Sequence, residues 1–264
     1  MKQVLVYRDE GTKLTDVIAC RILDHGNKTA VGFVTAYDIK YGALEEGCDL
    51  LIVGGGIGTR AYEEKLGPKG AGKIREFVRK GGRYLGICAG ACYGMKNTHW
   101  GFSTPKEIID QYSPALVEGV AYGTIKLDVD HGIRDGAMDK SLAIRMYDGT
   151  AKSSTVVGLK WSGGKTSKAF YSGGCWFYGP DGAFETLAGY DFGNYEKSAV
   201  IRASYGRGTV VLSGPHIELG AEDMAKLSRG LKKTSIEAKR YRMLAKTGFR
   251  SILPSLVGAM LRRS

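Results

Sequence analysis

The feature that most constrains this chain is a short apolar run followed by three glycines. Residues 48–53 read Cys-Asp-Leu-Leu-Ile-Val, and Gly54, Gly55 and Gly56 follow directly. Because polar residues do not alternate with the four apolar ones, the run predicts a strand that is buried on both faces. Such strands are typical of parallel sheets, whose two faces are covered by helices.

The rest of the first ninety residues repeats this pattern of strand and helix. We expect strands over residues 3–7, 30–34 and 84–87, and helices along the apolar stripes of residues 14–22 and 74–78. Strand–helix repeats of this length imply right-handed crossovers between parallel strands. They therefore predict a doubly wound sheet with helices on both faces.

The pattern changes after about residue 120. Gly, Tyr, Thr and Val dominate residues 120–213, which predicts β-hairpins, and the apolar run 209–212 is expected to return to the main sheet. Residues 221–264 are expected to be helical and basic. We therefore predict an α/β fold: a flavodoxin-like doubly wound parallel sheet with a β-rich insertion over residues 1–220, followed by a basic helical C-terminal tail.

Most of the positive charge lies in the tail. The chain has 38 Lys and Arg against 27 Asp and Glu, a net charge of +11, and residues 221–264 carry +8 of it. The same segment contains an apolar stripe, formed by Phe249, Ile252, Leu253, Leu256, Val257 and Met260. Two roles stay open: the stripe packs on the body or on a second subunit, or the charged face binds an anionic partner such as nucleic acid or an acidic protein.

The composition favours a cytoplasmic protein with no cofactor and no metal. No apolar stretch approaches the roughly 18 residues of a membrane span. Five cysteines, an odd number without a C-x-x-C pair, favour free thiols in a reducing compartment over disulfides or a structural zinc site. Residues 67–73 resemble a phosphate-binding loop, but Ile74 replaces the Ser or Thr that holds magnesium. His131, in an acidic turn, is expected to be solvated and not to bind a metal.

The strongest local motif surrounds Cys88. Residues 86–91 read Gly-Ile-Cys-Ala-Gly-Ala and directly follow an expected strand. A turn this tight requires small neighbours and presents Cys88 at the carboxyl edge of the sheet, as in a nucleophile elbow. Free N–H groups at the start of the next helix favour the thiolate. The alternative is an ordinary buried cysteine, but the glycines on both sides favour the elbow.

A base for Cys88 is expected just after the last strand. His216 follows the apolar run 209–212, so it lies at the same edge of the sheet if the two strands are parallel neighbours. Glu218 can then orient the imidazole ring as the third member of a triad. Taken alone, His-x-Glu fits a surface loop with a nearby carboxylate. Combined with the elbow, it favours the triad.

The glycine loop and the elbow are expected to supply an oxyanion-binding site. The loop with Gly55 and Gly56 follows a parallel strand next to the strand of the elbow. Backbone N–H groups at this edge, from Gly55 or Gly56 and from Ala89, can therefore point at the oxygen that becomes charged when a thiolate attacks a carbonyl group.

These motifs, in this α/β order, resemble the class I glutamine amidotransferase-like superfamily. Segments 81–91, 171–174 and 212–218 are similar to the N-terminal domain of eukaryotic-type biotin–protein ligases. The resemblance extends over roughly residues 1–220, and it implies both the fold and the triad. The biotin-activating catalytic domain of the ligase has no counterpart in the sequence, so the chain resembles the amidotransferase-like domain standing alone.

The resemblance implies a cysteine hydrolase, or an acyl or amide transferase, that acts on a small-molecule or peptide amide. In glutamine-hydrolysing relatives the position four after the nucleophile is usually Gln. Here it is Cys92, so glutamine is expected to be a poor substrate. Two alternatives stay open: a non-catalytic binding or regulatory module on the same fold, and an intracellular protease-like or deglycase-like enzyme. Glu218 favours the amidotransferase-like enzyme over the protease-like one.

Overall fold

The fold was analysed in a computed structural model of the chain. The structure describes residues 1–24, 29–100, 107–123, 127–128, 132–133, 154–192 and 195–262. Of the acidic turn expected around His131, Asp128 is described, whereas residues 129–131 lie outside the described residues.

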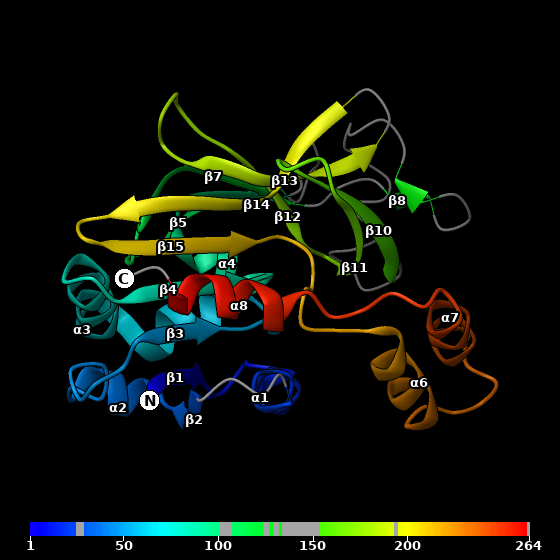
Figure 1. The fold of residues 1–264 in the computed structure, drawn as a ribbon, viewed down its shortest axis with the longest axis horizontal. Coiled ribbons are helices and arrows are strands. Elements are labelled where there is room, and N and C mark those ends of the chain that lie inside the picture. Colours follow the sequence, from blue (N-terminus) through cyan, green and yellow to red (C-terminus); the bar gives the residue numbers. More distant parts are fainter. Residues whose placement is uncertain are drawn as a thin grey trace.

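A five-stranded parallel sheet forms the centre of the molecule (Figure 1). Its strands are β1 (Lys2–Tyr7), β2 (Thr29–Val34), β3 (Leu50–Val53), β4 (Arg83–Ile87) and β15 (Gly208–Ser213). They lie in the order β2-β1-β3-β4-β15, and each is parallel to its neighbours. This is the strand order of flavodoxin-like folds, which confirms the predicted doubly wound sheet and the return of the last strand beside the strand of the elbow.

Helices cover both faces of this sheet, and alternate strand residues divide between the faces. The helices that follow the first four strands are α1 (Thr15–Leu23), α2 (Ala36–Lys40), α3 (Thr59–Arg79) and the short α4 (Ala89–Gly94). In β1, Val4 and Val6 pack with α1, whereas Leu5 and Tyr7 pack with α2 and α3. Side chains point alternately to the two faces of a strand, so only a strand without polar alternation fits between two helical layers.

The sheet continues beyond β15 as the β-rich insertion. Strand β14 (Tyr195–Tyr205) runs antiparallel to β15, and β12 (Cys175–Tyr178), β7 (Val117–Gly123), β5 (Met95–Trp100) and β6 (Ile108–Gln111) follow in that order. Strands β10 (Ser154–Trp161), β11 (Thr166–Ser172) and β13 (Glu185–Phe192) form a branch, and β8 (Leu127–Asp128) pairs with β9 (Gly132–Ile133). The insertion thus begins at Met95, directly after α4, and not near residue 120. The change in composition at residue 120 missed β5 because its sequence, MKNTHW, lacks an apolar alternation.

The C-terminal residues form three helices: α6 (Ala221–Arg229), α7 (Ile236–Ala245) and α8 (Leu253–Arg262). Figure 1 shows α6 and α7 beside one another at one end of the sheet, and α8 across the front of it. Phe249 and Ile252 of the expected helical stripe precede α8, which begins at Leu253. Leu253, Val257 and Met260 join the core formed by α1 and the parallel strands, so the stripe packs on the body. No helix in the described part of the chain combines the length and the apolarity needed to cross a membrane.

Because α8 contributes to the core, truncating its first buried side chain should destabilise the whole fold. Leu253 is fully buried, and we expect Leu253→Ala to lower the free energy of unfolding by about 2–5 kcal/mol. The exposed Ser255 of the same helix provides the control, since Ser255→Ala should change it by less than about 0.5 kcal/mol. Urea denaturation followed by circular dichroism measures both. Equal stability of the two variants would show that α8 is not part of the core.

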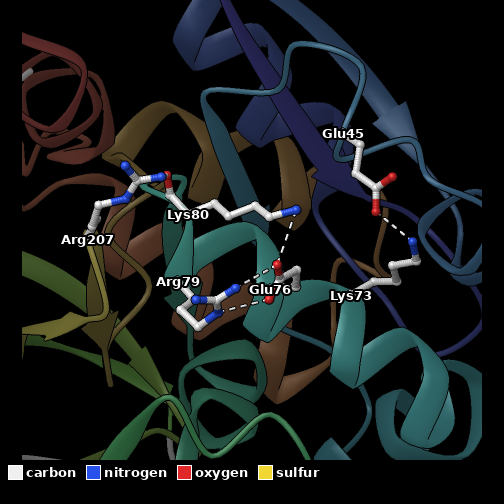
Figure 2. A network of polar contacts seen from close by, with 6 residues as sticks. All are labelled: Glu45, Lys73, Glu76, Arg79, Lys80 and Arg207. Carbon is white, nitrogen blue, oxygen red and sulfur yellow. Dashed lines mark hydrogen bonds and ion pairs between the residues drawn. The ribbon is translucent and has the colours of Figure 1, made fainter.

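The segment that resembles a phosphate-binding loop lies inside α3, where Gly67 produces a kink, and not between a strand and a helix. Figure 2 shows its lysine, Lys73, paired with Glu45, and one turn later Glu76 paired with Arg79 and Lys80. These are exposed ion pairs on the helix surface, and such pairs contribute little to stability. The charged side chains of the segment therefore belong to an ordinary solvated helix face, whereas Gly70 and Ala71 pack inward.

Candidate active site

Cys88 occupies a strained turn between β4 and α4. Its backbone angles, φ 53° and ψ −112°, are unusual for a residue with a side chain. Gly90 makes the turn possible, because a Cβ atom at this position would lie 1.9 Å from the carbonyl oxygen of Val53. The amide of Gly90 donates to the carbonyl of Gly54, 3.2 Å away, which ties the elbow to the neighbouring strand. The geometry is that of the elbow expected from the sequence, and backbone strain of this kind is concentrated at functional sites.

His216 and Glu218 lie at the same edge of the sheet, because β15 runs parallel to β4 with Ser213 beside Ile87. Nδ1 of His216 donates to Oε1 of Glu218 over 2.7 Å. Both side chains are buried, His216 being 7% and Glu218 0% exposed. A carboxylate in this position fixes the orientation and the tautomer of the ring, and leaves Nε2 for a second partner.

The imidazole of His216 lies next to Cys88. A Cβ atom on Gly55 would lie 2.7 Å from Cε1 of His216 and 3.5 Å from Cβ of Cys88, so only glycine leaves room for the two side chains. Burial by itself lowers the pKa of His216, but the charge interactions and hydrogen bonds of the ring with Glu218 and Cys88 outweigh burial and hold this pKa well above its usual value. The site therefore favours the protonated, imidazolium form of His216.

The thiol of Cys88 opens into a cavity of about 510 Å³. Its walls are formed by residues 56–58 of the loop after β3, by residues 59–61 at the start of α3, by Cys88 and Ala89, by Trp100, Ile108, Asp110 and Tyr112 of the insertion, and by residues 172–173. Gly56 and Ala89, two of the three residues expected to bind an oxyanion, border the cavity. Gly55 does not; it lies under the ring of His216.

One wall of the cavity carries a charged pair that sequence reasoning missed. Arg60 binds Asp110 through two hydrogen bonds of 2.8 and 3.1 Å, and the hydroxyl of Tyr112 donates to the same carboxylate over 3.1 Å. These residues are separated by fifty positions along the chain, and β5 and β6 bring them together. No short-range sequence pattern links Arg60 to Asp110. From the sequence, only the fact that both residues are charged could have indicated that they lie in a site.

The other described cysteines differ from Cys88 in their surroundings. Cys92 packs on the opposite face of the sheet, where a hydrogen bond with Cys175, together with burial, holds the pKa of its thiol well above the usual value. Burial raises the pKa of Cys48 to about 12. Cys20 is exposed. All five cysteines are free thiols, and Cys92 makes no contribution to the cavity lining.

Comparison with known proteins identifies the family. The sequence model described as "Biotin-protein ligase, N terminal" matches residues 2–251, nearly the whole chain. The chain belongs to the biotin–protein ligase N-terminal family. It is 30% identical over 182 residues to an uncharacterized protein of Chlamydia muridarum, and 28% identical over 215 residues to the biotin–protein ligase of Schizosaccharomyces pombe. These matches cover 66% and 80% of the chain, but only 62% and 32% of the two relatives.

Solved structures of glutamine amidotransferases share the fold. The structure of PurLQS from Thermotoga maritima matches with a TM-score of 0.53 and 14% identity, over 93% of this chain and 98% of that one. A crystal structure of a glutamine amidotransferase matches with a TM-score of 0.52 and 17% identity, over 92% and 98%. The resemblance to both families is therefore confirmed, with the amidotransferase likeness established at the level of the fold.

The site's chemistry is that of acids, bases and a thiol. Among the residues that the structure describes, no group of three His, Cys, Asp or Glu side chains could hold a metal ion. What the arrangement offers is a thiol on a strained turn, a buried imidazole held by a carboxylate, and backbone N–H groups at the cavity edge. This combination can form and break a thioester.

Proposed function

We propose that the chain is a cysteine hydrolase, or an acyl or amide transferase, that acts on an amide or ester of a small molecule or peptide. One observation carries the proposal: Cys88, on a strained elbow, faces a cavity from beside a buried histidine whose ring is held by Glu218. Glu218 as the acid also favours this class over a protease-like or deglycase-like enzyme. The five free cysteines support a reducing compartment such as the cytoplasm.

In the proposed reaction the Cys88 thiolate attacks the carbonyl carbon of the substrate. A C–S bond forms, the carbonyl electrons move to oxygen, and N–H groups of Gly56 and Ala89 bind the oxyanion. As the carbonyl re-forms, the bond to the leaving amine or alcohol breaks, and the His216 imidazolium donates its proton to the leaving atom. An acyl-thioester on Cys88 remains. Glu218 stabilises the imidazolium throughout and keeps Nε2 directed at the thiol.

The thioester is then released by a second attack. Water, in a hydrolase, or an acceptor amine, in a transferase, adds to the thioester carbon while His216 removes its proton. The C–S bond breaks, and the thiolate–imidazolium pair is restored. Biotin transfer is not part of the proposal, because the chain spans only 32% of the fission-yeast ligase.

The proposal is tested by incubating the protein with p-nitrophenyl acetate and with small aliphatic amides, and then measuring the intact mass and mapping the modified peptide. We expect one acetyl group, on Cys88, that disappears with time as the thioester is hydrolysed. Cys20→Ala removes the most exposed thiol and should leave this result unchanged. A protein that binds these compounds without acylation of Cys88 would be a binding or regulatory module on the same fold.

Glutamine should be a poor substrate. Cys92 occupies the position where glutaminases usually carry Gln, and its side chain packs away from the cavity on the other face of the sheet. The charged groups of the described cavity wall, Arg60 and Asp110, are already bound to one another. We therefore expect ammonia release from glutamine at less than about 1 s⁻¹, below the common range of enzyme turnover. A coupled ammonia assay measures it, and turnover within that range would contradict this prediction.

A further inference from the structure

We infer that Ser251, in the segment just before α8, is a positioning residue for the proposed Cys88–His216–Glu218 triad. The inference rests on the proposed function for its kinetic consequences, but its structural basis is independent of any substrate. Three donors, from the two residues before α8 and from its first residue, converge on the carbonyl oxygen of Ile217. They are the hydroxyl of Ser251 at 3.0 Å, the amide of Ile252 at 2.8 Å and the amide of Leu253 at 3.1 Å.

The bound carbonyl lies between the two triad residues. Ile217 separates His216 from Glu218, and its own side chain is buried in the core. The carbonyl of Ile217 belongs to the peptide plane that joins Ile217 to Glu218, so holding it fixes the point from which the Glu218 side chain leaves the backbone. Holding this carbonyl therefore supports the Glu218 side of the 2.7 Å contact between the carboxylate and the imidazole.

The carboxylate of Glu218 depends on this backbone support. Its Oε1 atom accepts from His216, but its Oε2 atom is buried and has no hydrogen-bond partner among the described residues. A buried carboxylate held by a single side-chain bond can rotate or shift unless its backbone is held. The only groups that bind the carbonyl of Ile217 in the described structure belong to residues 251–253.

A second contact of the tail is linked to His216 through Phe170. The ring of Tyr241 in α7 packs on Phe170, with ring centroids 6.2 Å apart, and Phe170 packs in turn on the ring of His216 at 5.8 Å. The amide of His216 also donates to the carbonyl of Phe170 over 2.7 Å. The C-terminal segment thus supports the base from two directions. Of these contacts, we assign the positioning role to the hydrogen bond from the Ser251 hydroxyl to the carbonyl of Ile217. A substitution can remove this hydroxyl without changing the backbone.

The experiment compares variants at residue 251 in the full-length chain. Ser251→Ala removes the hydroxyl, and Ser251→Thr keeps it. Ser251→Val places a side chain there that has nearly the shape of threonine but no hydroxyl. Ser228→Ala is the control, because the hydroxyl of Ser228 is also largely buried and donates to a carbonyl, but within α6 and away from the triad. Single-turnover acetylation of Cys88 by p-nitrophenyl acetate gives the rate. The far-downfield proton resonance of the His216 Nδ1–H reports its bond to Glu218 without any substrate.

We expect Ser251→Ala and Ser251→Val to acetylate about fivefold more slowly and to lose or broaden the Nδ1–H resonance, as the loss of one hydrogen bond would give. Ser251→Thr and Ser228→Ala should behave like the unchanged protein. Unchanged resonance and rate in both Ser251→Ala and Ser251→Val would overturn the inference, as would equal slowing in Ser228→Ala. If the unchanged protein shows the resonance but no acetylation, the proposed function fails, and the resonance alone decides whether Ser251 positions the pair.

Discussion

Replacing His216 by alanine should slow acetylation of Cys88 by about 10²- to 10⁴-fold, the usual contribution of a general acid–base group. The side chain is buried beside the thiol, and Glu218 holds it in one orientation. Without it, the thiolate loses its neighbouring cation and the leaving group loses its proton donor. Stopped-flow detection of p-nitrophenolate in a single turnover measures the rate.

Two further variants make this result specific. Glu218→Gln should slow the reaction less than His216→Ala, because Glu218 only orients and stabilises the ring. His99→Ala is the matched control, since His99 also pairs with a glutamate, Glu107, but does not line the cavity. It should acetylate at the unchanged rate. A His216→Ala variant that reacts as fast as the His99→Ala control would leave Cys88 without this base.

Replacing Gly90 by alanine should lower the free energy of unfolding by about 3 kcal/mol, a large effect for one methyl group. The added Cβ atom would lie 1.9 Å from the carbonyl oxygen and 2.6 Å from the carbonyl carbon of Val53. Both are backbone atoms of a central strand, so neither can move aside cheaply. We expect the elbow to be displaced and Cys88 acetylation to be lost together with stability.

The control for Gly90 is another glycine with free space around it. A Cβ atom on Gly72, in α3, meets nothing within 4 Å, and alanine favours a helix more than glycine does. Gly72→Ala should therefore raise the free energy of unfolding by about 0.5–1 kcal/mol. Urea denaturation of the two variants gives both numbers. Equal stabilities would show that the elbow is not packed against β3 as described.

The parallel sheet and the elbow could be predicted from sequence because their signals are local. The run 50–53 lacks polar alternation, and residues 86–91 pair a cysteine with small neighbours after a strand. These two features predict the edge of the sheet at which Cys88 lies. His216 lies at the same edge because β4 and β15 are parallel neighbours. A parallel sheet places all its carboxyl ends together, so residues far apart in the chain become predictable partners.

The wall of the cavity and the role of the tail could not be predicted in the same way. Arg60 and Asp110 meet only because β5 and β6 extend the sheet past the elbow, and no spacing along the chain encodes that contact. The apolar stripe of the tail indicated a buried face but not the surface that covers it. The convergence of residues 251–253 on Ile217 depends on three backbone and side-chain donors whose directions appear only in the folded chain.

The assignment of Cys88 as the nucleophile is tested most directly by the relative rate at which iodoacetamide alkylates each of the five thiols, measured by peptide mapping over time. Accessibility alone would make the exposed Cys20 react first, since Cys88 is only 8% exposed. We expect the reverse: Cys88 should react fastest near neutral pH, because a neighbouring imidazolium and a helix N-terminus activate a thiol. The His216→Ala variant should lose this advantage. Labelling of Cys20 ahead of Cys88 in the unchanged protein would contradict the assignment of Cys88 as an activated nucleophile.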